Sequence, residues 1–388
     1  MNARVTYDHL KVVREKRAEQ LLSKAVTIDP SFTISKVISI INENDAYDVF
    51  CMKGNSCFTI NARDLLAARD ILKMKVDSLL RRIQPLSKSS TLEETAAMLT
   101  HYRMRSVPVV DKNQIIGTVK AKNIIELLAQ HSLNWITANT ILTSNPITID
   151  SKELLSKARK IIMSNRIDHI PVINNGKISN VITTMHLLPL LIPSERKGSD
   201  EKGLNPSRRL DSQIGNIGSA RIPQCNTNDS LDTVMGSILK ANTSCCLLTL
   251  WGNLHGIITY GDLLNLLEKK ISSEVPLYIM GLPEDLNNAE IVKTKFQKII
   301  KNLTKVYPEV EEARSSIKII HKTASERKNY EVAVRVLTPY ETHNYTEMGR
   351  DLSKIFDILG QRVIRTLSKR SKKRWKMSIR KIDKSKIF

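Results

Sequence analysis

An internal repeat constrains the fold of this chain more than any other feature of its sequence. The segment RSVPVVDKNQIIGTVKAKNIIELL (105–128) resembles DHIPVINNGKISNVITTMHLLPLL (168–191), and Pro108 and Pro171 occupy the same place in the two copies, 63 positions apart. Each copy reads as an apolar strand, a polar turn, a second apolar strand and an amphipathic helix. Such self-similarity predicts a fold assembled from repeated supersecondary units.

A helix is predicted before each copy, over residues 91–104 and 151–167. Thr91 and Ser151 are the predicted N-caps of these helices, because acidic residues follow each of them in the first turn. Each repeat therefore reads as helix, strand, turn, strand, helix.

The same order of elements recurs over 31–72 and 229–270, so four repeats are predicted. The polar segment that precedes the fourth repeat is predicted to be a loop or insertion. The predicted organisation is an N-terminal helical extension (1–26), repeat 1 (27–75), repeat 2 (76–131), repeat 3 (132–193), a polar linker (194–213), repeat 4 (214–272) and a basic C-terminal domain (273–388).

The candidate binding motif lies in the stretch GIITYGDLL (256–264), where Gly256, Thr259 and Asp262 mark the junction of a strand with a helix. A hydroxyl and a carboxylate at such a junction lie beside free backbone N–H groups and the positive end of a helix, which favours contact with phosphate and ribose. Thr and Asp are also ordinary helix caps. The motif therefore leaves ligand binding and helix capping open.

The other three repeats depart from this motif at its polar positions. We interpret most of these residues as helix caps or packed side chains, although a lysine there retains a charge that suits a phosphate. The corresponding residues are Phe58, Asn61 and Asp64 in repeat 1, Gly117, Lys120 and Asn123 in repeat 2, and Asn180, Thr183 and His186 in repeat 3.

The repeats and the GIITYGD motif resemble the CBS domain, a small β-α-β-β-α unit. The resemblance implies an α/β (α+β) fold in which tandem repeats form two paired modules. It also implies an adenine nucleotide (AMP, ADP or ATP) as ligand, with Thr259 and Asp262 contacting its phosphate and ribose and Gly256 completing the motif. No cofactor is expected to be required.

After Lys270 the pattern changes. The sequence predicts a strand at 275–285, a helix at 287–313, strands at 315–324 and 329–339, and a long helix at 351–377, with one more strand near 340–349. The end of the chain is strongly basic, because residues 362–388 contain twelve Lys and Arg residues and a single acid. Such a concentration of positive charge predicts a polyanionic partner.

The arrangement over 275–375 resembles the ribosome hibernation-promoting factor family, whose compact β-α-β-β-β-α domain occupies the mRNA and tRNA channel of the small ribosomal subunit. The resemblance implies binding to ribosomal RNA, and it leaves open whether the large subunit is also contacted. Together with CBS repeats, this domain resembles archaeal CBS-containing ribosome-associated proteins.

A basic stripe on the last helix is the predicted RNA-binding surface, with Trp375 as a stacking residue or, alternatively, as part of the domain's own core. Membrane binding is not expected, because the apolar residues of this helix are needed to cover the sheet. The RNA-binding candidates are Arg362, Arg365, Lys369, Arg370, Lys372, Lys373, Arg374 and Trp375.

The sequence shows no P-loop, GxSxG, HExxH or GxGxxG motif, so no enzymatic activity is expected. Five cysteines without metal-ligand spacing are interpreted as reduced core residues. No apolar run approaches the roughly 20 residues of a membrane span, and no secretory signal is visible, so a cytoplasmic protein is expected.

Two functional hypotheses follow. The first is a factor that docks on the small ribosomal subunit, excludes mRNA and tRNA sterically and so silences translation, with an adenine nucleotide adjusting this binding. The alternative is a CBS-based nucleotide-sensing regulator that binds DNA or a protein partner.

Overall fold

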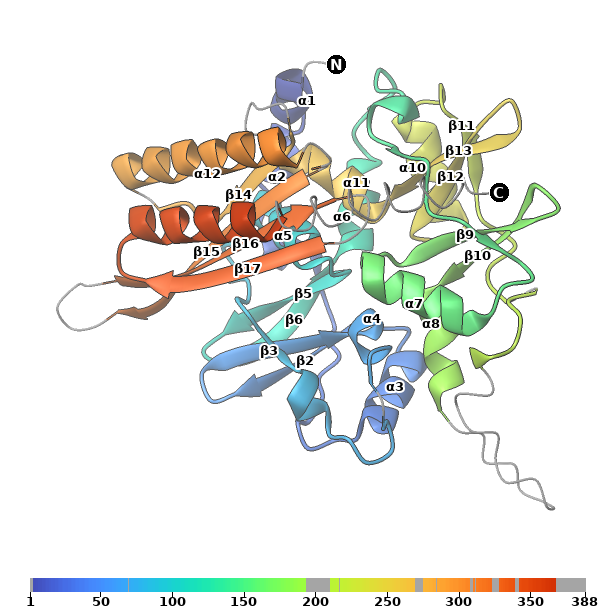
Figure 1. Cartoon of the computed structure of the whole chain (residues 1–388), viewed down its shortest axis with the longest axis horizontal. Coiled ribbons are helices and arrows are strands. Elements are labelled where there is room, and N and C mark those ends of the chain that lie inside the picture. The colour runs from blue at the N-terminus through green and yellow to red at the C-terminus, as the bar shows by residue number, and fades with distance from the viewer. Residues whose placement is uncertain are drawn as a thin grey trace, which may run out of the picture. The chain divides into compact units, whose positions relative to one another are not determined.

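The computed structural model of the chain describes residues 3–68, 70–192, 210–215, 217–268, 275–283, 285–307, 310, 312–322, 328–338 and 342–367 (Figure 1). The chain forms two compact units, Met1–Glu268 and Lys269–Phe388.

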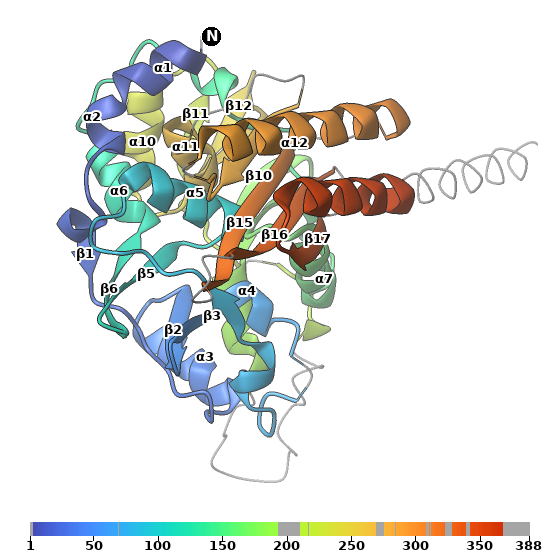
Figure 2. The ribbon, with the colours of Figure 1, turned by 90° about the vertical axis from the view of Figure 1, so that its left-hand side faces the viewer.

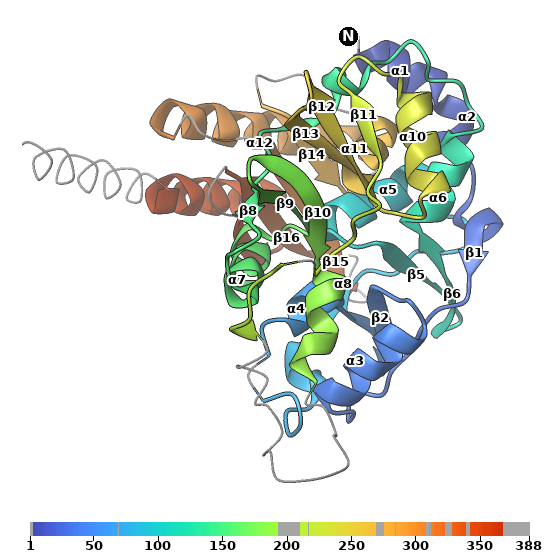
Figure 3. The same ribbon diagram turned by 90° about the vertical axis from the view of Figure 1, so that its right-hand side faces the viewer.

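The first unit contains four repeats, each with a helix, an antiparallel strand pair and a second, shorter helix (Figures 2 and 3). The elements are α3 (Ile34–Glu43), β2 (Asp48–Lys53), β3 (Ser56–Asn61) and α4 (Ala62–Leu65) in repeat 1; α5 (Leu92–Tyr102), β5 (Ser106–Asp111), β6 (Gln114–Lys120) and α6 (Ala121–Leu128) in repeat 2; α7 (Leu155–Asn165), β9 (His169–Asn174), β10 (Lys177–Thr183) and α8 (Thr184–Leu187) in repeat 3; and α10 (Leu231–Lys240), β12 (Cys245–Leu250), β13 (Asn253–Thr259) and α11 (Tyr260–Leu264) in repeat 4.

An opening segment runs parallel to the first strand of every pair, which completes the β-α-β-β-α unit. In repeats 3 and 4 it is a short strand, β8 (Ile149–Asp150) beside β9 and β11 (Gln224–Asn226) beside β12. In repeats 1 and 2 it is a single parallel bridge, Thr27 with Phe50 and Leu86 with Val109. The predicted fold class of tandem repeats is therefore confirmed.

Linking segments pair with the outer side of each second strand. These are β4 (Arg81–Ile83) on β3, β1 (Leu22–Ser23) on β6, β7 (Thr143–Ser144) on β13, and a bridge from Ser219 to Val181 of β10. Short helices complete the unit: α1 (Ala3–His9), α2 (Lys11–Arg14), η1 (Ala18–Leu21), η2 (Val76–Leu79), η3 (Ala138–Thr140), η4 (Leu188–Leu191) and η5 (Asn265–Leu267).

Gly256 lies where the linking strand β7 pairs with β13. A Cβ atom at this position would lie 2.8 Å from Leu142 Cδ1 and 3.1 Å from the carbonyl oxygen of Thr143. Gly117 stands at the same place in repeat 2, where a Cβ would lie 2.9 Å from both Leu22 Cδ2 and the Ser23 carbonyl oxygen. Because glycine has no Cβ atom, the linking segment can approach the second strand closely at this position of the motif.

The four repeats form a ring in the order 1, 2, 4, 3. Strand β2 contacts β5 and β6, α6 contacts α11, and α4 contacts α8. Val181 of repeat 3 packs with Cys245, Leu247 and Ile257 of repeat 4, which closes the ring.

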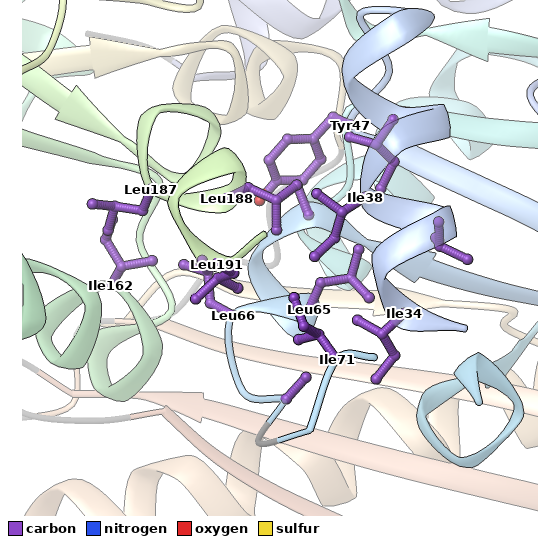
Figure 4. Packing of buried hydrophobic residues seen from close by; sticks show 14 of the residues in the cluster. Ile34, Ile38, Tyr47, Leu65, Leu66, Ile71, Ile162, Leu187, Leu188 and Leu191 are labelled. Carbon is purple, nitrogen blue, oxygen red and sulfur yellow. The ribbon is translucent and has the colours of Figure 1, made fainter. Parts of the chain in front are cut away.

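One large core cluster lies between the helices of repeats 1 and 3. Figure 4 shows Leu65 and Leu66 of repeat 1 near Leu188 and Leu191 of repeat 3, with Ile38 close by. Burying each such side chain stabilises the fold by about 1.5–3 kcal/mol. All five cysteines of the chain are buried.

The second unit has a four-stranded sheet in the order β14-β15-β16-β17. Its elements are β14 (Leu277–Met280), α12 (Leu286–Val306), β15 (Glu312–Lys322), β16 (Lys328–Leu337) and β17 (Thr342–Gly349), followed by a helix over residues 352–367. Strand β14 is parallel to β15, and the other pairs are antiparallel. The observed order is β-α-β-β-β-α, and the strand predicted near 340–349 is confirmed as β17.

Two helices cover one face of this sheet. Phe296 and Phe356 pack edge to face with their ring centroids 6.2 Å apart. The apolar residues of the last helix that were predicted to cover the sheet are buried: Ile355, Phe356, Leu359, Val363 and Leu367.

The prediction for Ser151 was wrong, whereas that for Thr91 is confirmed. Thr91 forms a capping box with Glu94 at the start of α5. Ser151 lies in a turn, and α7 begins only at Leu155, whose N–H donates to the carbonyl oxygen of Ser212 at 3.0 Å. A distant backbone segment thus replaces the expected side-chain cap.

Gly256→Ala is expected to lower the free energy of unfolding by about 1–3 kcal/mol, because the added methyl group meets Leu142 and the Thr143 carbonyl. The matched control is Gly236→Ala in α10, where a Cβ meets no atom within 4 Å. This control should stabilise the protein by about 0.5–1 kcal/mol. Urea unfolding measures both, and equal stability of the two variants would contradict the role assigned to Gly256.

Candidate functional site

One backbone hydrogen bond recurs in all four repeats and places the candidate motif. The N–H of the first residue of the second helix donates to the carbonyl of the residue just before the first strand. The pairs are Ala62 to Tyr47 (2.8 Å), Ala121 to Arg105 (2.8 Å), Thr184 to Asp168 (3.3 Å) and Tyr260 to Ser244 (3.2 Å). The helix start of every motif is therefore held against the residue that precedes the first strand.

The residues at these strand starts meet where the four repeats join. Tyr47 of repeat 1 donates a hydrogen bond to Asp168 of repeat 3, and the Arg105 guanidinium of repeat 2 lies 4.3 Å from the centroid of the Tyr47 ring. His169 of repeat 3 bonds to Ser244 Oγ of repeat 4 at 2.7 Å. The central cluster comprises Tyr47, Asp48, Arg63, Arg105, Asp168, His169 and Ser244.

Asp168 is the buried anion of the central cluster. Its carboxylate accepts hydrogen bonds from Thr184 Oγ1 at 2.8 Å and Arg63 Nη1 at 3.2 Å. Burial by itself would raise the pKa of Asp168, but the positive charges of Arg63 and Arg105 outweigh it and hold the pKa at about 2. Asp168 therefore stays ionised, and Arg63 is held in place by it.

The pKa of Asp48 is shifted in the opposite direction to that of Asp168. Burial raises the pKa of Asp48 to about 7, although the N–H groups of Arg105 and Ser106 each donate to its Oδ2 at 2.8 Å and the Arg105 charge also lowers the pKa. The side chain is 2 % exposed. Asp48 thus exchanges a proton near neutral pH inside the ring.

His169 is held neutral. Burial lowers the pKa of His169 to about 3, and the charge of Arg105 lowers it further, while Asp168 acts in the opposite direction. A neutral imidazole can donate or accept toward Ser244, so this contact between repeats 3 and 4 needs no counter-ion.

Two polar atoms of the cluster have no hydrogen-bond partner among the described residues. These are Nη2 of Arg105 and Oδ1 of Asp48, and both atoms are buried. A buried guanidinium nitrogen without an acceptor is costly, and an anionic ligand would satisfy it. Burial raises the pKa of Tyr260, which follows Thr259 in repeat 4, to about 12, and the Arg105 charge acts in the opposite direction. The positive charge of Arg105 therefore acts on Tyr260, which lies beside the repeat 4 motif.

The repeat 4 motif is intact and forms a capping box. Asp262 Oδ2 accepts from the Thr259 N–H and from Thr259 Oγ1, both at 2.7 Å. Asp262 Oδ1 accepts from Thr143 Oγ1 of the linking strand β7 at 3.3 Å. The capping role that the sequence left open is therefore realised, and the exposed Asp262–Thr143 contact is the one that a ribose hydroxyl could replace.

Two other repeats have the same kind of contact between the acidic position of the motif and the linking strand. Asn123 Nδ2 donates to Ser23 Oγ at 2.9 Å in repeat 2, and Arg81 Nη2 donates to Asp64 Oδ1 at 3.0 Å in repeat 1. Both residues of the linking strand align with Thr143 in their pairing register. In three repeats, therefore, the residue at the acidic position of the motif holds the linking strand by a hydrogen bond.

The remaining motif residues act at helix starts. In repeat 3, Thr183 forms a capping box with His186, and burial lowers the pKa of His186. Asn61 accepts from the Asp64 N–H at 2.9 Å. Lys120 is the N-cap residue of α6 without a side-chain cap, and it is exposed. Asn180 bonds to the Ile217 carbonyl at 2.7 Å.

Two of the predicted RNA-binding residues are described, and both are exposed on the last helix. Arg362 forms an ion pair with Glu347 at 2.8 Å and donates to the Thr346 carbonyl at 3.1 Å, and Arg365 lies one turn further along. The other candidates lie outside the described residues: Lys369, Arg370, Lys372, Lys373, Arg374 and Trp375.

Sequence reasoning missed the central cluster, although a signal for it existed. Arg105 and Asp168 lie 63 positions apart, the same spacing as Pro108 and Pro171, so they occupy one position of the repeat. A comparison of polar residues at that position would have found the centre of the ring.

Among the described residues, no group of three or more His, Cys, Asp and Glu side chains could hold a metal ion. No helix in the described part of the chain is long and apolar enough to cross a membrane.

Fold and site together define a class of protein in which repeated β-α-β-β-α units surround a shared polar centre. Residues 76–130 and 138–192 match the model of the CBS domain, so the chain contains tandem CBS domains. The resemblance inferred from the repeats is confirmed. These matched segments do not reach the second unit, whose resemblance to the hibernation-promoting factors stays a prediction.

Comparison with other proteins supports the fold. The structure of protein MJ1225 from Methanocaldococcus jannaschii, described as a proposed archaeal homologue of g-AMPK, has a TM-score of 0.57 at 18% identity and aligns with 64% of this chain and 99% of its own. The uncharacterized protein MJ1404 of the same organism is 21% identical over 312 residues, which are 77% of this chain and 74% of that protein. Inosine-5'-monophosphate dehydrogenase of Staphylococcus aureus is 24% identical over 104 residues, 20% of its length.

Asp48 and His169 give opposite dependences of stability on pH. The folded-state pKa of Asp48 is raised from 3.8 to about 7, so its contribution is complete below pH 4 and is lost as the pH rises through 7. The folded-state pKa of His169 is lowered from 6.5 to about 3, so stability is lost as the pH falls below 6.5. In the wild type these two slopes oppose each other.

Asp48→Asn removes the first slope and keeps an oxygen for the two N–H donors. Relative to the wild type, the variant should gain stability between pH 4 and pH 7, by up to about 4 kcal/mol. Urea unfolding at a series of pH values measures this difference, and Asp45→Asn on an exposed turn is the control. A difference that does not change with pH would mean that Asp48 is ionised throughout.

Proposed function

We propose that residues 1–268 bind an adenine nucleotide and act as a regulatory unit without catalytic activity. The observation that supports this proposal is the buried Arg105 Nη2, which has no acceptor among the described residues. The nucleotide would place its ribose at Asp262 and Thr143 and its phosphate groups toward Thr259 and Arg105. The resemblance of the repeats and the motif to CBS domains favours an adenine nucleotide as this ligand.

Nucleotide binding would act through the ring. A phosphate group bound to Arg105 would compensate the positive charge of that guanidinium, which now acts on Asp48 and Asp168. These two carboxylates join repeats 1, 2 and 3. It would thereby favour one arrangement of the repeats over another, and a ligand shifts such an equilibrium only by its differential affinity for the two arrangements.

Isothermal titration with AMP, ADP, ATP and adenosine tests this site. The full chain should bind the nucleotides, and adenosine more weakly because it lacks the phosphate groups. Asp262→Asn should weaken nucleotide binding about tenfold or more, because a charge-assisted hydrogen bond to ribose is lost. His186→Asn, at the same position of repeat 3, is the matched control and should leave the affinity unchanged. Absence of heat with every nucleotide would refute the proposal.

We propose further that the second unit docks on the RNA of the small ribosomal subunit in the cytoplasm and blocks the path of mRNA and tRNA. Two observations favour this function. The unit has the β-α-β-β-β-α order that the hibernation-promoting factor resemblance implies, and the net charge of residues 362–388 is +11. Phosphate contacts of this kind supply affinity without reading sequence. The alternative is a regulator that binds DNA or a protein.

Co-sedimentation with purified archaeal small subunits tests the second proposal. Replacing five tail residues by Ala should weaken association and flatten its salt dependence, with a slope of about −0.7 to −0.9 lost for each phosphate contact. The residues are Lys369, Arg370, Lys372, Lys373 and Arg374.

A control of equal charge separates the tail from the general effect of net charge. It replaces five exposed lysines of the first unit by Ala: Lys24, Lys73, Lys75, Lys152 and Lys240. Its association should remain close to that of the wild type. Equal weakening by the two variants would contradict docking by the tail, and tighter binding to duplex DNA than to the subunit would favour the alternative.

A further inference from the structure

The two carboxyl oxygens of Asp48 lie in different surroundings. Oδ2 accepts from the N–H groups of Arg105 and Ser106, each at 2.8 Å, and from the Ser106 hydroxyl at 3.2 Å. Oδ1 is buried and has no hydrogen-bond partner among the described residues. Because Oδ2 already accepts these bonds, a proton on the carboxyl group belongs on Oδ1. Asp48 can therefore bind a proton without breaking a hydrogen bond.

Among the described residues, the charges that act on Asp48 come from guanidinium groups. Arg105 precedes β5, Arg63 lies on α4, and the charge of each interacts with Asp48. On β3, the residue opposite Asp48 in register is the neutral Asn61. Strand β6, which also contacts β2, ends at the exposed Lys120. The ionised form of Asp48 is thus supported by Arg63 and Arg105.

These two arginines differ in their own partners. Arg63 Nη1 forms an ion pair with Asp168 at 3.2 Å, whereas Arg105 Nη2 is buried without an acceptor among the described residues. An incoming phosphate group would therefore find its donor on Arg105. Its negative charge would compensate the guanidinium, and Asp48 would lose support for its ionised form.

The other acid, the histidine and the tyrosine of the central cluster keep their charge between pH 6 and pH 8. Burial would raise the pKa of Asp168, but Arg63 and Arg105 hold it at about 2. Burial lowers the pKa of His169 to about 3 and raises that of Tyr47. Asp48, whose pKa burial raises to about 7, is the member of this set that titrates in that range.

We propose that nucleotide binding by the ring is linked to proton uptake at Asp48 Oδ1, so that the proton and the nucleotide each raise the affinity of the ring for the other. This inference rests on the proposed nucleotide site at Arg105 and adds regulation of that site by pH. Asp48 acts through Arg105 and does not touch the ligand. The ring thereby responds to acidity as well as to nucleotide concentration.

Isothermal titration of the full chain tests this inference, with whichever of AMP, ADP and ATP binds most tightly. Titrations at pH 7.5 in two buffers of different ionisation enthalpy give the number of protons taken up. If the bound phosphate raises the pKa of Asp48 by about one unit, about half a proton is taken up per nucleotide. The affinity should then fall about sixfold from pH 6.5 to pH 8.5.

Asp48→Asn isolates the proton bound at this position. The amide has the charge of the protonated carboxyl group and keeps an oxygen for the two N–H donors, so the variant should bind the nucleotide without this uptake and without the fall in affinity. Protons exchanged by the phosphate groups themselves contribute equally to wild type and variant. Asp45→Asn on an exposed turn is the matched control and should take up protons as the wild type does.

The outcomes separate this inference from the proposed function. Nucleotide binding with equal proton uptake by the wild type and Asp48→Asn would overturn the link to Asp48 and leave the nucleotide site standing. Absence of nucleotide binding would refute both. Should Asp48→Asn fail to fold, the wild type decides alone, because an affinity that stays constant or rises between pH 6.5 and pH 8.5 also overturns the proposal.

Discussion

Charged groups buried at the junction of the four repeats bind those repeats to one another. Asp168 of repeat 3 keeps its charge because Arg63 of repeat 1 lies 3.2 Å away, and Asp48 of repeat 1 is held by the backbone of Arg105 and Ser106 in repeat 2. Removing one member of a buried pair strands the other and typically costs about 3–5 kcal/mol. Each repeat therefore depends on a neighbour for its electrostatics, so we expect the ring to respond as a whole when a ligand alters any one of these charges.

The repeats and their internal order could be predicted from sequence because they rest on local patterns. Short apolar runs mark β5, β6, β9 and β10, and an apolar stripe marks α6. Such patterns act over a few residues, as the capping box of Thr91 with Glu94 does. The same local reasoning failed for Ser151, since α7 begins where the distant Ser212 carbonyl accepts the Leu155 N–H. A polar residue before a helix predicts a cap only when no other segment supplies the missing bond.

The candidate site was harder to predict because its contacts join residues far apart in the chain. Tyr47 and Asp168 are 121 positions apart, and His169 and Ser244 are 75 apart. The motif at Gly256, Thr259 and Asp262 was found and its capping role was foreseen, but its contacts with the linking strand β7 were not visible from sequence. The hydrogen bond between Asp262 and Thr143 has a counterpart between Asn123 and Ser23. A residue at a motif position can therefore stabilise the fold whether or not its repeat binds a ligand.

Burial also explains how one chain could bind two kinds of polyanion without confusing them. The cation proposed to bind the phosphate groups of the nucleotide is Arg105, whose Nη2 atom is buried in the ring. Exposed charges are screened beyond a Debye length of about 8–10 Å at physiological salt, whereas buried pairs are screened much less. Contacts of RNA with the basic end of the chain should thus depend steeply on salt, and contacts of a nucleotide with the ring only weakly. If both proposals hold, we expect RNA not to compete for the buried Nη2 of Arg105, so nucleotide binding and RNA binding would be independent.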